Sequence, residues 1–196
     1  FLDLHARAAR MVADLPPDAV IGVAPHSLRA VTPAALATVA ETLPGPVHMH
    51  LAEQVAEVEE IEAAYGARPV EWMLEHRRPD EAWCLIHCTQ MSPHETEGLA
   101  ATGAVAGLCP ITEASLGDGI FDGVRWLDAG GRIAVGSDSN IRISLAEELR
   151  QLEYSQRLRD RARAVLAEPE GSTGARILGA CLTGGAQAMG RRSGRI

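Results

Sequence analysis

The sequence predicts an α/β protein built on a parallel sheet, and three observations support this fold class. Five short apolar runs recur along the 196 residues, and each is too short for a helix. Helical patterns with clear start signals separate these runs. No glycine-rich phosphate-binding loop follows any of them, which argues against a nucleotide-binding sheet. The alternation indicates either a doubly wound sheet or part of a (β/α)₈ barrel, since both join parallel strands by right-handed crossovers.

The five predicted strands are nearly continuous in their apolar character, as strands buried on both faces are. They cover Val20–Ala24, Val47–Met49, Trp83–Ile86, Val105–Leu108 and Ile133–Val135. A complete barrel needs about 250 residues, so five strand–helix units form only part of one. We therefore expect residues 1–196 to be a single domain, and an incomplete barrel domain if the strands belong to a barrel. The chain begins inside a helical pattern, Phe1 to Leu15, and ends in a turn-rich stretch at 190–196, so both ends look cut.

Three helix starts are readable from the sequence. Thr32 stands before a proline, which fits an N-cap followed by a residue that needs no amide donor. Ser92 also precedes a proline, and Glu95 follows three residues later, which predicts a capping box. Ser144 and Glu147 repeat this spacing and predict a second capping box.

Composition limits the partners and the compartment. The formal net charge of −8, with no basic stripe to offset it, argues against nucleic acid or an anionic membrane as a partner. The total charge says little about a small-molecule substrate, because an anionic one would need local arginines whatever the total. No signal peptide or bilayer-length apolar run is visible, which favours a cytoplasmic protein. The four cysteines, Cys84, Cys88, Cys109 and Cys181, are expected to be free and reduced because their spacing fits neither a disulfide framework nor a zinc knuckle.

Polar residues gather where the predicted strands end. His26 follows the first strand, His50 closes the second with Glu53 three residues later, His87 closes the third, and Asp138 follows the fifth. In a parallel barrel every carboxyl end opens onto the same face, so these five side chains should converge. Imidazoles, a carboxylate ligand and a spare glutamate at one mouth are the parts of a hydrolytic zinc site.

Three motifs in this set carry a family resemblance. His50-Leu-Ala-Glu53, Ile86-His-Cys-Thr89 and Gly136-Ser-Asp-Ser-Asn140 resemble the fifth-, sixth- and eighth-strand motifs of the amidohydrolase superfamily. The His-x-Ala-Glu form is typical of its deaminase branch, which includes guanine deaminase and the triazine chlorohydrolases. The resemblance implies a metal-dependent hydrolase with a TIM-type barrel. This chain would hold about strands four to eight, without the amino-terminal strands and the flanking β-sandwich.

Longer segments resemble the formimidoylglutamate deiminases within that branch. These segments are 25–31, 48–54, 110–121 and 136–140. They imply zinc-dependent hydrolysis of N-formimino-L-glutamate to N-formyl-L-glutamate and ammonia, a reaction of histidine degradation. One alternative is a deaminase or chlorohydrolase acting on a heterocycle such as guanine, although an aromatic content of 4% suits such a pocket poorly. The other is a truncated, catalytically incompetent chain.

The resemblance also implies a metal centre. His50 and Asp138 would be ligands of one zinc ion, and the remaining ligands would come from a first-strand His-x-His that this chain lacks. The segment alone is therefore expected to be inactive. His48-Met-His50 could be mistaken for that pair, but Glu53 and His87 follow at the spacing of the fifth and sixth strands. His48 then faces the barrel interior, one pleat from His50.

The remaining roles follow from the same resemblance. Asp138 would also take the proton from the attacking water, and His87 would stabilise the charge that develops. Glu53 would carry a proton to the imine nitrogen and then to the departing ammonia. His26 would contact the formimino group, and Arg29 would hold a substrate carboxylate, since a guanidinium matches a carboxylate bidentately. The superfamily implies a homodimer for the full-length form.

Overall fold

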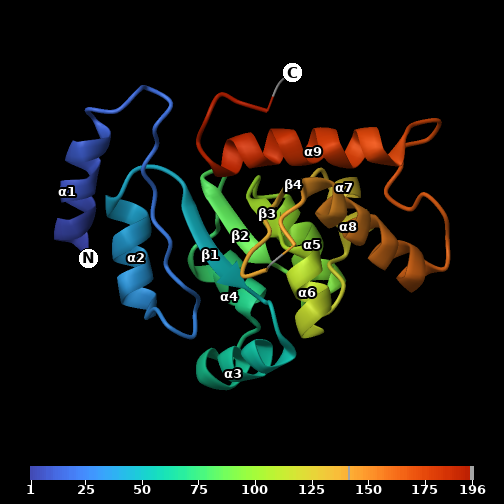
Figure 1. The fold of residues 1–196 in the computed structure, drawn as a ribbon. Helices are drawn as coiled ribbons and strands as arrows, with labels where there is room; N and C mark the ends of the chain where they lie inside the picture. Colours follow the sequence, from blue (N-terminus) through green and yellow to red (C-terminus); the bar gives the residue numbers. More distant parts are fainter. Residues whose placement is uncertain (141, 195–196) are drawn as a thin grey trace.

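The computed structural model describes residues 1–140 and 142–194, and it contains a parallel sheet with the order β1-β2-β3-β4 (Figure 1). The strands are β1 (Val47–Leu51), β2 (Trp83–His87), β3 (Val105–Leu108) and β4 (Arg132–Val135). The predicted α/β class and four of the five predicted strands are confirmed. Residues 195 and 196, at the end of the predicted turn-rich stretch, lie outside the described residues.

Helices connect and cover these strands. They are α1 (Leu2–Val12), α2 (Pro33–Thr42), α3 (Val55–Tyr65), α4 (Pro69–His76), α5 (Pro93–Ala100), α6 (Pro110–Leu116), α7 (Gly123–Asp128), α8 (Leu145–Asp160) and α9 (Thr173–Ala188). Across the described part of the chain, none of them combines the length and the apolar character that crossing a bilayer requires.

Two of the predicted helix starts form as expected and one differs. The Thr32 hydroxyl accepts a hydrogen bond at the start of α2, and Ser92 and Glu95 form a reciprocal capping box at α5. Ser144 is the N-cap of α8, but its side chain makes no capping bond, so the second capping box is wrong. Glu147 lies 2.7 Å from Arg142 instead, because an ion pair with a nearby guanidinium competes for its carboxylate.

The predicted first strand, Val20–Ala24, is not a strand in the structure. It keeps one parallel bridge, between Val23 and Val47. The carbonyls of Val23 and His26, three residues apart, accept from β1 amides only two residues apart, those of His48 and His50. This extra residue breaks the even spacing that a parallel ladder requires, and a proline at position 25 offers no donor to repair it. The segment still lies alongside β1.

The two faces of the sheet differ, since one packs on the main hydrophobic core and the other carries a smaller apolar cluster. Val47, Met49 and Leu51 of β1 are buried in the core, whereas His48 and His50 alternate with them and point to the other face. A second, smaller apolar cluster lies apart from that core, made by residues of β2, β3, β4 and α9: Cys84, Val105, Ala134 and Ala188. All four cysteines are free and buried, as predicted.

Helix α9 lies across the amino ends of the strands (Figure 1). The Gln187 amide donates to the carbonyls of Glu81 and Gly103, which precede β2 and β3. His48 contacts the Ala188 carbonyl at 2.7 Å, also at this end. A Cβ on Gly184 would lie 2.0 Å from the Ile133 carbonyl oxygen, so only glycine allows this close approach. The carboxyl ends of the strands are thus the end away from α9.

Candidate active site

The structure brings five of the six predicted site residues together at the carboxyl ends of the strands. The His50 ring centroid lies 4.8 Å from that of His26 and 5.7 Å from that of His87. His87 Nε2 lies 3.7 Å from Oε1 of Glu53 and 3.9 Å from Oδ2 of Asp138. These contacts join residues at the carboxyl ends of β1, β2 and β4 with His26 in the segment beside β1, the convergence predicted from the strand ends.

The sixth residue, Arg29, has a different partner. Its Nη1 lies 3.9 Å from Oε2 of Glu60 on α3, and both side chains are partly exposed to solvent. In the part of the chain that the structure describes, its ion pair is with Glu60 and not with the histidine cluster. A long, partly exposed pair of this kind is weak, so the guanidinium stays available to another carboxylate.

The His26 carbonyl fixes the orientation of His50. Its oxygen accepts from the His50 backbone amide at 3.0 Å and lies 2.8 Å from His50 Nδ1. A carbonyl can only accept, so Nδ1 carries a proton, and in the neutral ring Nε2 keeps its lone pair. This is the tautomer that a metal-binding histidine needs, with the second ring nitrogen anchored to a backbone oxygen. The donor chemistry of His50 therefore fits a zinc ligand.

His87 reaches the site through an unusual backbone conformation. Its register partner on β1 is Leu51, which is buried on the core side, whereas His50 is paired with Ile86. Regular alternation would therefore place the His87 side chain on the face away from His50. The backbone at His87 has φ 73°, a left-handed conformation that turns the ring towards His50.

Left-handed backbone recurs at each strand end that carries a site residue. Besides His87, the non-glycine residues Ala52 (φ 51°), Cys88 (φ 52°) and Asp138 (φ 53°) adopt it. Such residues cost of order 1–3 kcal/mol each and persist only where surrounding contacts hold them. Four of the eight such residues in the described part of the chain lie at these strand ends, and backbone strain of this kind is common at functional sites.

Three carboxylates surround the buried His87 ring. Nδ1 lies 3.2 Å from Oε1 of Glu113, while Nε2 faces Glu53 and Asp138. Because a carboxylate accepts, Nδ1 carries the proton and Nε2 is turned towards the other two acids. Burial lowers the pKa of His87, but the Glu113 hydrogen bond and the three negative charges outweigh it and raise that pKa above 6.5. The site therefore favours positive charge.

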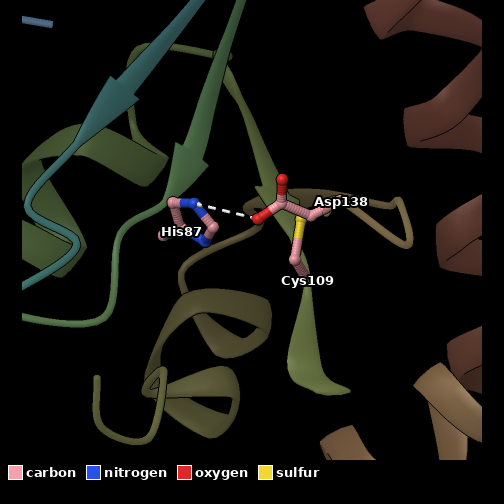
Figure 2. A group of neighbouring side chains, drawn as sticks. All are labelled: His87, Cys109 and Asp138. Atoms are coloured by element: carbon pink, nitrogen blue, oxygen red, sulfur yellow. Dashed lines mark ion pairs between the residues drawn. The ribbon is translucent and has the colours of Figure 1, made fainter. Parts of the chain in front are cut away.

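One group of side chains in the described residues could hold a metal ion, and it differs from the predicted ligand pair. The ligand atoms of His87, Cys109 and Asp138 lie within 4.8 Å of one another (Figure 2). Burial, then nearby carboxylates including Glu113 and Asp138, raises the pKa of the Cys109 thiol well above its usual range. Since a metal binds the thiolate, this thiol is a poorer ligand than the imidazole of His50.

Cys109 and Glu113 were not among the predicted site residues. They follow β3, the one predicted strand end to which the sequence reasoning assigned no polar residue. A search for candidate residues just after this strand, as after the other four, would have identified both. Glu113 also accepts from the Cys109 amide at 2.8 Å, so one buried carboxylate holds both the turn after β3 and the His87 ring.

Both the sequence and the fold of this chain match known proteins. A profile of the Amidohydrolase family matches residues 3–196. Formimidoylglutamate deiminase from Pseudomonas aeruginosa is 48% identical over 179 residues, which are 90% of this chain and 40% of that protein. A 5-methylthioadenosine/S-adenosylhomocysteine deaminase from Natronomonas pharaonis is 30% identical over 181 residues, 88% of this chain and 40% of that protein. The chain thus spans about 40% of the length of these curated relatives.

Two solved structures share the fold. The crystal structure of an amidohydrolase from Brucella melitensis is 56% identical with a TM-score of 0.87, over 90% of this chain and 40% of that one. An adenosine deaminase from Xanthomonas campestris, solved with bound zinc, is 27% identical with a TM-score of 0.83, over 96% of this chain and 44% of that one. The parallel sheet is therefore part of a TIM-type barrel.

Proposed function

The chain belongs to the amidohydrolase family, and on that premise we propose that it carries the carboxyl-terminal part of a zinc-dependent deaminase. The proposed reaction is hydrolysis of N-formimino-L-glutamate to N-formyl-L-glutamate and ammonia, a step of histidine degradation. Its main support in the structure is the contact of His87 Nε2 with both Glu53 and Asp138. This places two carboxylates and an imidazole around one point, as proton transfer to and from a substrate requires.

The proposed metal centre holds one divalent ion. His50 offers Nε2 in the correct tautomer, and Asp138 offers a partly exposed carboxylate. Further ligands would come from a His-x-His outside these 196 residues, since catalytic zinc sites use three or more protein ligands. When bound, zinc supplies a Lewis acid that makes water nucleophilic near neutral pH.

The side chains of this chain then divide the proton transfers. Asp138 takes a proton from the attacking water. Glu53 delivers one proton to the imine nitrogen as water adds and a second, from the new hydroxyl group, as the nitrogen leaves as ammonia, so both water protons end on it. His87 faces both acids through Nε2 and stabilises the charge that develops on the oxygen of the attacking water. Glu113 supports this role because its hydrogen bond to Nδ1 raises the pKa of His87.

The charge of the site suits this substrate. Glu53, Glu113 and Asp138 lie around the His87 ring, and the formimino group is an amidine, which is protonated in neutral water. A cationic head can therefore pair with Glu53, the acid that is neither a proposed zinc ligand nor hydrogen-bonded to Nδ1 of His87. The carboxylates at the other end of the substrate need a cation, and we assign that role to Arg29, with His26 beside the formimino group.

The test measures ammonia release by the natural full-length protein loaded with zinc. We expect turnover of N-formimino-L-glutamate and a large loss of kcat in Glu53→Gln with little change in KM. His50→Ala and Asp138→Ala should lower bound zinc as measured by elemental analysis. His48→Gln, whose side chain contacts the Ala188 carbonyl at the far end of the sheet, is the control that keeps zinc and activity. Deamination of guanine without turnover of N-formimino-L-glutamate would contradict the proposal.

A further inference from the structure

Glu57 is a buried carboxylate that the proposed chemistry does not use. It lies in the first turn of α3 and is fully buried. Its Oε1 accepts from the Ala52 amide at 3.0 Å, and its Oε2 accepts from the Glu53 amide at 2.8 Å. Both oxygens of one buried acid are therefore directed at two consecutive backbone amides, and the second belongs to a proposed catalytic residue.

This arrangement differs from ordinary helix capping. In a capping box, the acid at the third helical position bonds the amide of the N-cap, which here is Gln54. Glu57 reaches past the N-cap to the two residues before it, Ala52 and Glu53. Its two hydrogen bonds hold the turn between β1 and α3, and neither is made to an amide of α3.

The turn that Glu57 holds is strained and is held from a second side. Ala52 adopts φ 51°, a left-handed conformation unfavourable for a residue with a Cβ. The Thr89 hydroxyl lies within hydrogen-bonding distance of the carbonyls of Ala52, at 3.1 Å, and of Glu53. Glu57 accepts from the two amides. The single Thr89 hydroxyl proton serves one of the two carbonyls, and the Gln90 amide donates to the Ala52 carbonyl at 2.8 Å, so the backbone of this dipeptide is fixed on both sides.

We propose that Glu57 is a positioning residue that sets the Glu53 carboxylate opposite His87. The inference rests on the proposed function of Glu53 in proton transfer. With Ala52 in its left-handed conformation, the chain turns sharply after β1, and Glu53 Oε1 lies 3.7 Å from His87 Nε2. Without two acceptors for these amides, Ala52 returns towards ordinary backbone angles and Glu53 moves away from His87. Misplacement of a reacting group by about 1 Å costs on the order of 100-fold in rate.

The chain offers a matched control in Glu153 on α8. This residue is 3% exposed, and its two oxygens accept from the amides of Val165 and Leu166, each at 3.0 Å. Like Glu57, it is a buried acid that accepts from two consecutive amides, and it also pairs with Arg157 at 2.6 Å. Glu57→Gln and Glu153→Gln each replace one acceptor oxygen by an amide group that cannot accept, so both should lower the melting temperature.

The decisive comparison is kcat in the zinc-loaded natural full-length protein. Glu57→Gln should lose roughly 10- to 100-fold in kcat with KM nearly unchanged, whereas Glu153→Gln keeps wild-type kcat. Should Glu57→Gln fail to fold, Glu57→Asp replaces it, since it keeps the charge but withdraws both oxygens by one methylene group. Wild-type kcat in either folded Glu57 variant, or an equal loss in Glu153→Gln, would overturn the positioning role.

Hydrogen exchange separates this inference from the proposed function. The amides of Ala52 and Glu53 should be protected in the wild type, exchange at least about tenfold faster in Glu57→Gln, and stay protected in Glu153→Gln. A wild type that fails to turn over N-formimino-L-glutamate refutes the substrate, and the exchange data then decide the role of Glu57 alone. Unchanged protection of both amides in Glu57→Gln would refute it.

Discussion

Nδ1 of His87 lies 3.2 Å from Oε1 of Glu113, and both side chains are buried. The hydrogen bond links the end of β2 to the first turn of α6 and leaves Nε2 of His87 facing Glu53 and Asp138. It also accounts for part of the elevated pKa of His87. One contact thus sets the tautomer, the direction and the charge of the central imidazole.

Glu113→Gln should lower the pKa of His87 in the zinc-free protein. The substitution keeps an oxygen that accepts from Nδ1 or from the Cys109 amide, but it removes the negative charge that raises this pKa. NMR titration of the His87 ring measures the shift, and Glu153→Gln is the control that leaves it unchanged. A His87 pKa equal to the wild-type value would exclude Glu113 as its cause.

The same pair predicts how stability depends on pH. Because the folded pKa of His87 lies above its unfolded value, its protonation stabilises the fold fully below the unfolded pKa. This contribution disappears as pH rises through the folded pKa. The free energy of unfolding of the zinc-free protein, measured in urea between pH 5 and pH 9, should therefore fall less with rising pH in Glu113→Gln than in the wild type.

Glu148 gives an independent pH effect. Burial raises the pKa of its carboxyl, and its Oε2 accepts from the Ile111 amide at 2.9 Å. The folded state thus binds this proton more tightly than the unfolded state, and stability falls as pH rises from the unfolded pKa through the folded one. Glu148→Gln keeps an acceptor for the Ile111 amide. The free energy of unfolding, measured in urea, should then change less with pH over that range. Glu147→Gln, beside it on α8, removes one of the smaller charges that raise this pKa and should therefore flatten the slope less than Glu148→Gln.

Arg29→Met tests the carboxylate clamp. A charge-assisted hydrogen bond contributes roughly 1.5–3 kcal/mol, and a tenfold rate change is about 1.4 kcal/mol, so kcat/KM should fall by roughly one to two orders of magnitude. Zinc content should stay constant. Glu60→Gln, which removes the ion-pair partner of Arg29, should cause at most a small change. Equal losses on N-formimino-L-glutamate and on an analogue without its carboxylates would disprove the clamp.

Two adjacent glycines of α9 should respond oppositely to alanine. At Gly184 a Cβ would lie 2.0 Å from the Ile133 carbonyl oxygen, whereas at Gly185 nothing lies within 4 Å. Gly184→Ala should destabilise the fold by about 1–3 kcal/mol or more, because α9 must move off the sheet. Gly185→Ala should stabilise it by about 0.5–1 kcal/mol through helix propensity. Urea unfolding of both variants checks the sign, and equal effects would refute the close packing of α9.

The strand ends could be predicted because two simple rules act together. Short apolar runs identify buried strands, and parallel topology brings their carboxyl ends to the same edge. That is why His26, His50 and Asp138, far apart in sequence, were expected near one another and are found in one cluster. The fold class needed no more than this alternation.

The remaining features depend on contacts that no local pattern shows. Regular alternation places His87 on the wrong face, and only its left-handed backbone brings it to His50. No strand forms at Val20–Ala24 because the segment has one extra residue between the carbonyls of Val23 and His26, which accept from β1. Glu57 and Glu113 look like surface helix acids in the sequence, because burial of a carboxylate depends on distant backbone amides.

The extra residue in the segment beside β1 has an evolutionary consequence. It is the backbone carbonyl of position 26 that anchors His50, through both the amide and the ring. Any amino acid supplies that carbonyl, so mutation of the exposed side chain at position 26 leaves the anchor intact. With His26 in its proposed contact with the formimino group, substrate preference can therefore diverge at this position among descendants of one gene while the orientation of the adjacent histidine is inherited unchanged.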